Sequence, residues 1–295
     1  MGVKLEAFVL VSARCSRVML AGAGVAGVAY RMTTLAAIQM VSTPDVSENL
    51  AAAEGLVAQA AGMGATLVSL PEYFCLMSAD DGDRLRIAEN PGEGPIQAAL
   101  GAMARRHGIW LLGGTVPLRR EGSARVRNAS LMFAPDGVVA AQYDKIHLFA
   151  MGTYDEAVVL EAGDTPVCVD AAGLNVGLSV CYDLRFPELF RLLGAKAPLD
   201  VICAPSAFTY ATGEDHWELL VRARAVENQC HVVAAAQGGR HAGGRRTWGN
   251  SMVVDPWGVV LDRVEVGEGV AVGVFDRARV EEIRARLPVL GHRRV

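Results

Sequence analysis

Three chemically active side chains each lie in or just after a strand-like stretch of this sequence. Cys181 ends the apolar run "LNVGLSVC", and the residues that follow suit a helix. Glu72 follows the run "TLVSL" and Pro71, which cannot extend a strand ladder. Lys145 lies in "QYDKIHLF" and is one of three lysines among 28 lysine and arginine residues. Because α/β proteins place their sites at strand ends, the three residues are candidates for one site.

A thiol, a carboxylate and an ammonium together form a workable set for acyl transfer. The carboxylate of Glu72 can take the thiol proton, and the Cys181 thiolate can then attack a carbonyl carbon. The ammonium of Lys145 and the backbone N–H of Tyr182 can stabilise the oxyanion that results. A helix N-terminus after Cys181, with cations nearby, would lower the pKa of the thiol.

Each of these residues also has a structural explanation. Cys181 can be a buried core cysteine, and Glu72 can be a solvated loop charge. Strand alternation places Lys145 on one face with Tyr143 and His147, and that face can be exposed to water. A cysteine–histidine pair is a further alternative, although none of the six histidines stands in a local signature with the cysteine. No spacing of cysteines and histidines suggests zinc, so no metal is expected.

The composition predicts a globular protein. Hydrophobic residues make up 52% of the 295 residues and charged residues 20%. The net charge is −4 and no basic run could follow a phosphate backbone, which argues against nucleic-acid binding. The six cysteines form no C-x-x-C pair, and a chain of this length needs no disulfide framework. A reducing, cytosolic setting is therefore expected.

The first 31 residues stand apart from the rest of the sequence. Residues 18–30 are apolar but too few to span a bilayer, so no membrane association is expected. The core pattern begins only with "TLAAIQMV" at Thr34, and translation starting at Met32 explains this most simply. Residues 1–31 are thus predicted to be an extension outside the fold. No linker interrupts residues 32–295, which are predicted to form a single domain.

Strand-like and helix-like stretches alternate along that domain. Strands are predicted at "TLAAIQMV", "TLVSL", "IWLLGGTVPL", "LNVGLSVC", "DVICAPS" and "HVVAAAQ", and helices over residues 96–107, over residues 187–195 and in "DHWELLVRARAVENQ". Two similar hairpins, around residues 135–137 and 256–258, close the two halves of the chain. The pattern predicts an α/β fold with two pseudo-equivalent halves, in which two mixed sheets pack face to face with helices outside.

Three motifs of the sequence resemble those of a known family. "LPEYF", "YDKIHLF" and "SVCYDLRFPELF" are similar, in this order, to the motifs of the nitrilase superfamily, the carbon–nitrogen hydrolases. The resemblance runs from Met32 to the C-terminus and implies a four-layer α-β-β-α sandwich. It also implies that Glu72 is a general base, Lys145 an oxyanion-stabilising cation and Cys181 the nucleophile, without a cofactor. Glu156 matches a second family glutamate that helps orient the lysine or the substrate amide.

The segments "PSAFTYATGEDHWELLVRARAVENQCHVVAAAQGGRH" and "LPVLGHRR" look like the Nit-type amidases of this superfamily. The resemblance implies hydrolysis of deaminated glutathione to 2-oxoglutarate and cysteinylglycine, by a homodimer or a higher homo-oligomer. The alternatives are an ω-amidase acting on 2-oxoglutaramate, a nitrilase, and a catalytically silent binding protein. The segment "LFAMGTYDE" looks shorter than the matching loop of bacterial relatives.

Three further residues are candidates for binding a small amide substrate. Arg185 lies four residues after Cys181, where its guanidinium could grip a substrate carboxylate through two hydrogen bonds. Thr212 could add a hydroxyl contact, and Tyr182 lies directly beside the cysteine. The alternative for Arg185 is a structural ion pair with Asp183 or Glu188.

Overall fold

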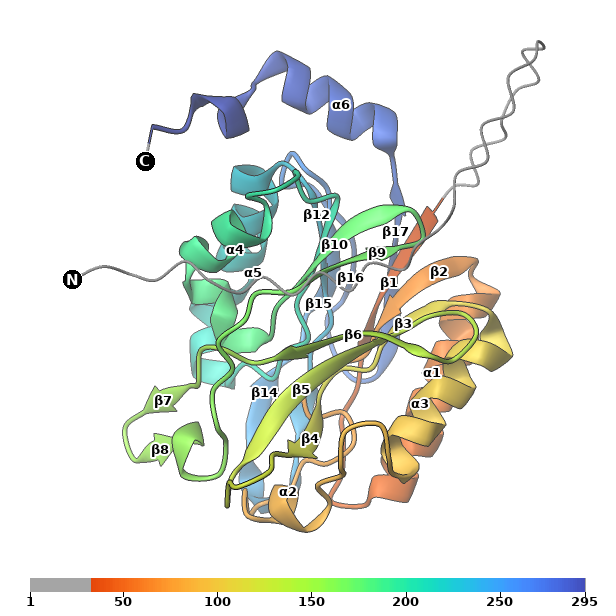
Figure 1. The fold of residues 1–295 in the computed structure, drawn as a ribbon, viewed down its shortest axis with the longest axis vertical. Coiled ribbons are helices and arrows are strands. Elements are labelled where there is room, and N and C mark those ends of the chain that lie inside the picture. The colour runs from red at the N-terminus through yellow and green to blue at the C-terminus, as the bar shows by residue number, and fades with distance from the viewer. Residues whose placement is uncertain (1–32, 295) are drawn as a thin grey trace.

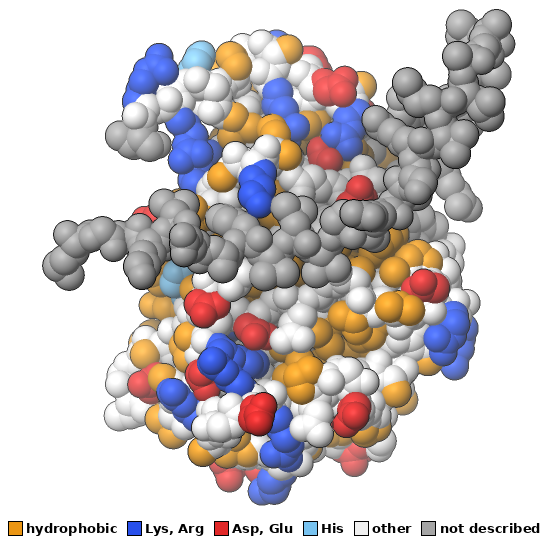
Figure 2. All heavy atoms as spheres, in the orientation of Figure 1, with side chains coloured by type: hydrophobic (Ala, Val, Ile, Leu, Met, Phe, Trp, Pro, Cys, Tyr) orange, Lys and Arg blue, Asp and Glu red, His pale blue; other side chains and the backbone are white. Residues whose placement is uncertain are grey.

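The structure is a computed structural model that describes residues 33–294 (Figure 1). The predicted extension, residues 1–31, lies outside the described residues. Within residues 33–294, no helix is both long enough and apolar enough to cross a membrane. On the face shown in Figure 2, acidic and basic side chains are interspersed between apolar ones.

The first sheet has seven strands and is mixed. Its strands β1, β2 and β3 are parallel to one another, whereas β17, β5, β4 and β6 are each antiparallel to the strand they pair with. In spatial order these strands are β17 (Gly269–Phe275), β1 (Thr33–Gln39), β2 (Ala65–Ser69), β3 (Trp110–Leu112), β5 (Val126–Phe133) and β4 (Val116–Arg119), with β6 (Val139–Asp144) also paired to β5. Helices α1 (Val46–Gly62) and α3 (Pro95–His107) cover its outer face (Figure 1).

The second sheet has six strands and is mixed in the same way. Strands β10, β11 and β12 are parallel, and antiparallel strands flank them on both sides. The order is β16 (Val260–Val264), β15 (Ser251–Val254), β12 (His231–Ala234), β11 (Val201–Cys203), β10 (Leu174–Leu178) and β9 (Cys168–Ala171). Helices α4 (Pro187–Leu193) and α5 (Tyr210–Asn228) lie on its outer side (Figure 1).

The two sheets pack face to face, and strand β1 shows how the sequence requires this. Successive side chains of a strand point to opposite faces. Leu35 and Ala37 join the core shared with the second sheet, whereas Ala36 and Ile38 join the core under α1 and α3. All four side chains are fully buried, so β1 needs cover on both faces. The predicted four-layer α-β-β-α sandwich is thereby confirmed.

The stretch "IWLLGGTVPL", predicted as one strand, is interrupted. Its parts β3 and β4 both pair with β5, on either side of Gly113–Thr115. Gly114 has φ +54°, and a Cβ atom there would lie 2.1 Å from the carbonyl oxygen of Pro71. A continuous strand would therefore collide with the chain around Pro71. The interruption admits the segment that carries Glu72.

Both predicted hairpins are present at equivalent places in the two halves. The first joins β5 to β6, and the second joins β15 to β16. Gly137 and Gly258 both have φ +84°, which is why a glycine stands at the same point of each turn. The hairpins support the prediction of two pseudo-equivalent halves.

The remaining elements are short, apart from a C-terminal helix, and several surround the site. The segment "LFAMGTYDE" contains a small hairpin. The elements are α2 (Asp83–Arg86), β7 (Ala150–Met151), β8 (Tyr154–Asp155), β13 (Gly238–Arg240), β14 (Arg246–Trp248), α6 (Arg277–Arg286) and the 3₁₀ turns Glu156–Val158, Cys181–Arg185, Ala242–Gly244 and Val289–His292.

Candidate active site

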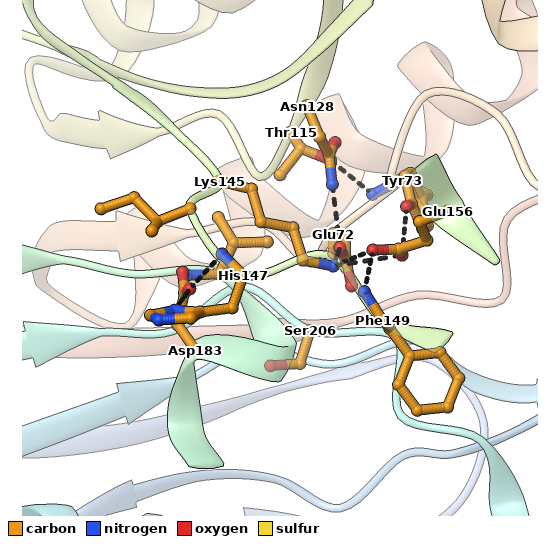
Figure 3. Close-up of polar contacts among 12 residues, drawn as sticks. Glu72, Tyr73, Thr115, Asn128, Lys145, His147, Phe149, Glu156, Asp183 and Ser206 are labelled. Carbon is orange, nitrogen blue, oxygen red and sulfur yellow. Dashed lines mark hydrogen bonds and ion pairs between the residues drawn. The ribbon is translucent and has the colours of Figure 1, made fainter. Parts of the chain in front are cut away.

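The ammonium group of Lys145 lies between two buried carboxylates (Figure 3). Its Nζ donates to Oε1 of Glu72 at 2.8 Å and to Oε2 and Oε1 of Glu156 at 2.8 and 3.1 Å. Strand β6 ends at Asp144, and the Lys145 side chain turns inward with 1% of its surface exposed. The alternative that Lys145 belongs to an exposed polar face is therefore wrong.

Glu72 is held on several sides but keeps one oxygen free. The side-chain amide of Asn128 donates to its Oε1 at 2.9 Å, and Gln237 donates to its backbone carbonyl at 3.2 Å. The backbone N–H of Tyr73 donates to the hydroxyl of Thr115, in the interruption between β3 and β4, at 2.9 Å. Oε2 of Glu72 is buried and has no hydrogen-bond partner among the described residues. A general base needs such an oxygen to receive a proton.

Glu156 completes this cluster from the start of a 3₁₀ turn. Besides Lys145, its carboxylate accepts the hydroxyl of Tyr73 at 2.8 Å and the backbone N–H of Phe149 at 2.8 Å. Its side chain is 4% exposed. These donors fix the position of the glutamate against the lysine, consistent with the orienting role that the family resemblance implies.

Cys181 lies just beyond the end of β10 and has an unusual backbone conformation. Its φ is +50°, a region that non-glycine residues rarely adopt, and its N–H donates to the carbonyl of Pro205 at 2.9 Å. Strain of this kind persists only where the surroundings enforce it, often at active sites. The residue lines a cavity together with Glu72 and Glu156, so the structure brings all four predicted catalytic residues together.

The prediction that the thiol pKa of Cys181 is lowered is wrong. Burial raises this pKa well above its usual value, the charge of Glu72 raises it further, and Lys145 opposes both. Cys181 begins only a short 3₁₀ turn, so no α-helix dipole acts on the sulfur. The resting group is therefore a thiol, and a base must remove its proton before attack.

The pKa values of the two other groups follow from the same burial. Burial raises the pKa of Glu72, Lys145 partly opposes it, and the charge of Glu156 adds to the increase. For Lys145, burial lowers the pKa, but the two carboxylates outweigh it and hold the pKa well above 10.5. The lysine thus stays an ammonium, while Glu72 is a stronger base than an exposed glutamate.

The sequence analysis missed Asp183, which connects the lysine segment to the cysteine segment (Figure 3). Its buried carboxylate accepts the hydroxyl of Tyr143 at 2.7 Å, Nδ1 of His147 at 2.7 Å and the backbone N–H of Val180 at 2.8 Å. The first two donors flank Lys145, and the third precedes Cys181. In the sequence, the alternation of Tyr143 and His147 indicated a shared polar face. It did not indicate that both side chains bind Asp183.

The predicted substrate-binding residues Arg185, Thr212 and Tyr182 all line the same cavity. The guanidinium of Arg185 lies 3.3 Å from Nδ1 of His216 and makes no ion pair with any carboxylate among residues 33–294. The alternative pairing of Arg185 with Asp183 or Glu188 is therefore not formed. None of the six histidines, all of which are described, lines the cavity, so nothing favours a cysteine–histidine pair.

The described residues contain no group of three or more histidine, cysteine or acidic side chains arranged to hold a metal ion.

Comparison with known proteins finds a family and a relative that match most of this chain. Residues 34–285 match the carbon-nitrogen hydrolase family. A deaminated glutathione amidase of Yersinia enterocolitica is 39% identical over 267 residues, which are 88% of this chain and 92% of that protein.

Two solved structures add to the comparison. The crystal structure of the Caenorhabditis elegans NitFhit protein has a TM-score of 0.84 and 36% identity, covering 89% of this chain and 65% of that one. An amidase of Nesterenkonia sp. AN1, with acrylamide added to its active-site cysteine, has a TM-score of 0.72 and 27% identity, covering 87% of this chain and 98% of that one. The chain belongs to the carbon–nitrogen hydrolase family of enzymes.

Proposed function

We propose that this protein is an amidase that hydrolyses a C–N bond of a small carboxylated substrate through a thioester on Cys181. The observation that carries the proposal is the Lys145 ammonium held between Glu72 and Glu156 beside the cavity that Cys181 lines. The similarity to the Yersinia deaminated glutathione amidase supports it, as does the adduct on the cysteine of the Nesterenkonia amidase.

In the first step the enzyme forms the thioester. Glu72 accepts the thiol proton at Oε2, and the sulfur of Cys181 attacks the amide carbonyl carbon. Lys145 and the backbone N–H of Tyr182 stabilise the oxyanion. The proton passes from Glu72 to the leaving nitrogen, the C–N bond breaks, and the amine departs. In the second step Glu72 takes a proton from water, hydroxide attacks the thioester, the C–S bond breaks, and the sulfur regains its proton.

Charge compensation explains why the lysine is held by two carboxylates. At rest, Glu72 and Glu156 both stabilise the ammonium. When Glu72 accepts the thiol proton it becomes neutral, so the lysine loses one of its two negative partners. Its charge is then available to the oxyanion at the moment that the oxyanion forms. A group that stabilises the transition state more than the ground state lowers the barrier.

We infer that the substrate is deaminated glutathione, which would yield 2-oxoglutarate and cysteinylglycine. Arg185 supports this assignment because its guanidinium lines the cavity without a carboxylate partner among the described residues. Charged donors bind carboxylates in partly buried sites more strongly than neutral donors do. Thr212, near the start of α5, also lines the cavity and offers a hydroxyl there. The same hydroxyl lies 2.8 Å from that of Thr209.

Replacing Arg185 with lysine tests this substrate assignment. We expect kcat/KM to fall about tenfold or more for deaminated glutathione and 2-oxoglutaramate, since the two-bond grip on a carboxylate is lost. A neutral short-chain amide should lose much less. The matched control is Arg191→Lys, which changes an arginine of α4 outside the cavity. Equal losses on all three amides would refute the clamp, and a wild-type preference for 2-oxoglutaramate would indicate an ω-amidase.

The pH dependence tests the role of Glu72. Only the carboxylate form can take the thiol proton, and burial raises its pKa above 4.5. We therefore expect kcat/KM to fall as the pH drops below the raised pKa of Glu72, which lies above 4.5. The fall should follow the protonation of a single group. A pH–rate profile between pH 4 and 9 measures this, and Glu72→Gln should remove the acid limb together with most of the activity. An acid limb at or below 4.5 would contradict the assignment.

We further infer the setting in which the enzyme works. The five cysteines among the described residues are free thiols, which suits a reducing, cytosolic environment. The single domain over residues 32–295 and the homodimer or higher homo-oligomer stay predictions.

A further inference from the structure

Two arginines of the cavity have no part in the mechanism above. Arg245 directly precedes strand β14, and Arg246 begins it, in the hairpin formed by β13 and β14. Both residues line the cavity that contains Cys181. Arg246 is exposed and lies over the ring of Tyr210, with its guanidinium carbon 3.8 Å from the ring centroid. Arg245 is half-buried and therefore less screened by water.

Arg245 shares its carboxylate partner with a second arginine. Its guanidinium lies 3.1 Å from Oδ1 of Asp81, but the same oxygen lies 2.7 Å from the guanidinium of Arg84. The Arg84 side chain is 5% exposed and that of Arg245 is 27% exposed. One carboxylate thus serves two guanidiniums, and the deeply buried one is closer. Arg245 therefore has no carboxylate partner of its own among the described residues, and it lines the cavity.

A row of three aromatic rings in the cavity wall separates Arg245 from Arg185. The rings of Tyr154 and Phe149 lie 5.9 Å apart, and those of Phe149 and Tyr182 lie 5.2 Å apart. Arg245 lies at one end, 5.5 Å from the ring of Tyr154, and Arg185 lies at the other, 5.9 Å from the ring of Tyr182. The cavity therefore has a cation at each end of one apolar wall.

The catalytic cluster lies beside this row. The backbone N–H of Phe149, which carries the central ring, donates to Glu156, and Glu156 binds Lys145. Tyr182, which carries the ring nearest Arg185, directly follows Cys181. A substrate lying along the wall would thus have its amide at the cluster and one end at each arginine.

We propose that Arg245 binds a carboxylate on the leaving-group side of the scissile amide. This proposal rests on the proposed function, in which Arg185 binds the acyl-side carboxylate. The enzyme would then select amides that carry a carboxylate on both sides of the C–N bond. Deaminated glutathione has this form, because its terminal glycine provides the second carboxylate. 2-Oxoglutaramate does not, because its leaving group is ammonia.

The test compares deaminated glutathione with its analogue in which the terminal glycine is glycinamide. Wild type should show a kcat/KM for the acid roughly tenfold to 100-fold above that for the glycinamide, the range expected for a hydrogen-bonded charge pair. Arg245→Gln should remove most of this difference through a loss on the acid. Arg245→Lys, which keeps the charge beside Asp81, should retain part of it. The control Arg240→Gln removes the same charge from the same hairpin outside the cavity and should keep the wild-type ratio.

Equal rates for the acid and the glycinamide in wild type would overturn the proposal. If Arg246→Gln loses the difference in kcat/KM between the acid and the glycinamide while Arg245→Gln keeps it, the assignment to Arg245 is overturned. Binding of both compounds to Cys181→Ala, measured by calorimetry, needs no turnover and separates the two proposals. If the acid binds more tightly through Arg245 but wild type does not cleave it, the proposed function fails and the carboxylate site stands. Equal binding refutes the site, whatever the activity.

Discussion

The Cys181→Ala variant is expected to lose turnover by roughly 10⁶-fold, the size of loss seen when a catalytic nucleophile is removed. Among the described residues that line the cavity, Cys181 is the one cysteine, so no second thiol is there to replace it. The variant should remain folded, because the change deletes one sulfur atom next to an open cavity. Steady-state kinetics on deaminated glutathione and circular dichroism measure the two effects.

Intact-mass spectrometry of acid-quenched reactions provides the direct evidence. Wild type should carry the mass of the acyl group on Cys181, and Cys181→Ala should carry none. The matched control is Cys168→Ala, which removes an exposed thiol of β9 that does not line the cavity. Wild-type turnover by Cys181→Ala, or an acyl group on another cysteine, would show that the nucleophile is wrongly assigned.

The Lys145→Met variant is expected to lose both activity and stability. Loss of an oxyanion-stabilising donor costs about 10²–10³-fold in kcat. Removal of one partner from a buried ion pair costs about 3–5 kcal/mol in the free energy of unfolding, since the carboxylates of Glu72 and Glu156 remain buried without their cation. Urea denaturation and kcat measurements on the same preparation test both expectations.

The stability loss of Lys145→Met should depend on pH with a defined sign. Without the ammonium, burial raises the pKa of Glu72 in the folded state above that of the unfolded chain. Such a group favours folding at low pH, where it is neutral, and destabilises the fold as the pH rises through the raised value. The difference from wild type should thus be largest near neutral pH and shrink towards pH 4. A constant difference would contradict the buried-charge explanation.

Two companion variants separate charge from geometry. Lys145→Arg keeps a positive charge, so it should be more stable than Lys145→Met, but it should still lose most of kcat. A planar guanidinium does not replace a compact ammonium in a side-chain site that is 0% exposed. Adding Glu156→Gln to Lys145→Met should recover part of the stability without restoring kcat. A fully active Lys145→Arg would show that the lysine only supports the fold.

Much of the fold could be predicted from the sequence because its signals are local. Alternating and continuous apolar runs indicated the strands, and paired Pro-x-Gly turns indicated the hairpins of both halves. The error at "IWLLGGTVPL" shows the limit of such signals. Its interruption depends on Pro71, which is more than forty residues earlier in the chain and packs against Gly114.

The sequence by itself determined which residue types stand at the strand ends, and with them the chemistry open to the site. Only the tertiary structure decided that Glu72 and Cys181 line one cavity, with Lys145 bonded to Glu72, since β2 and β10 belong to different sheets that meet by packing. It also reversed the expected pKa shift of Cys181, and it placed Asp183 and Arg245 at the site. Periodicity along a chain reports which face a side chain takes. Burial and partner charges depend on contacts between distant segments, such as the 73 positions that separate Lys145 from Glu72.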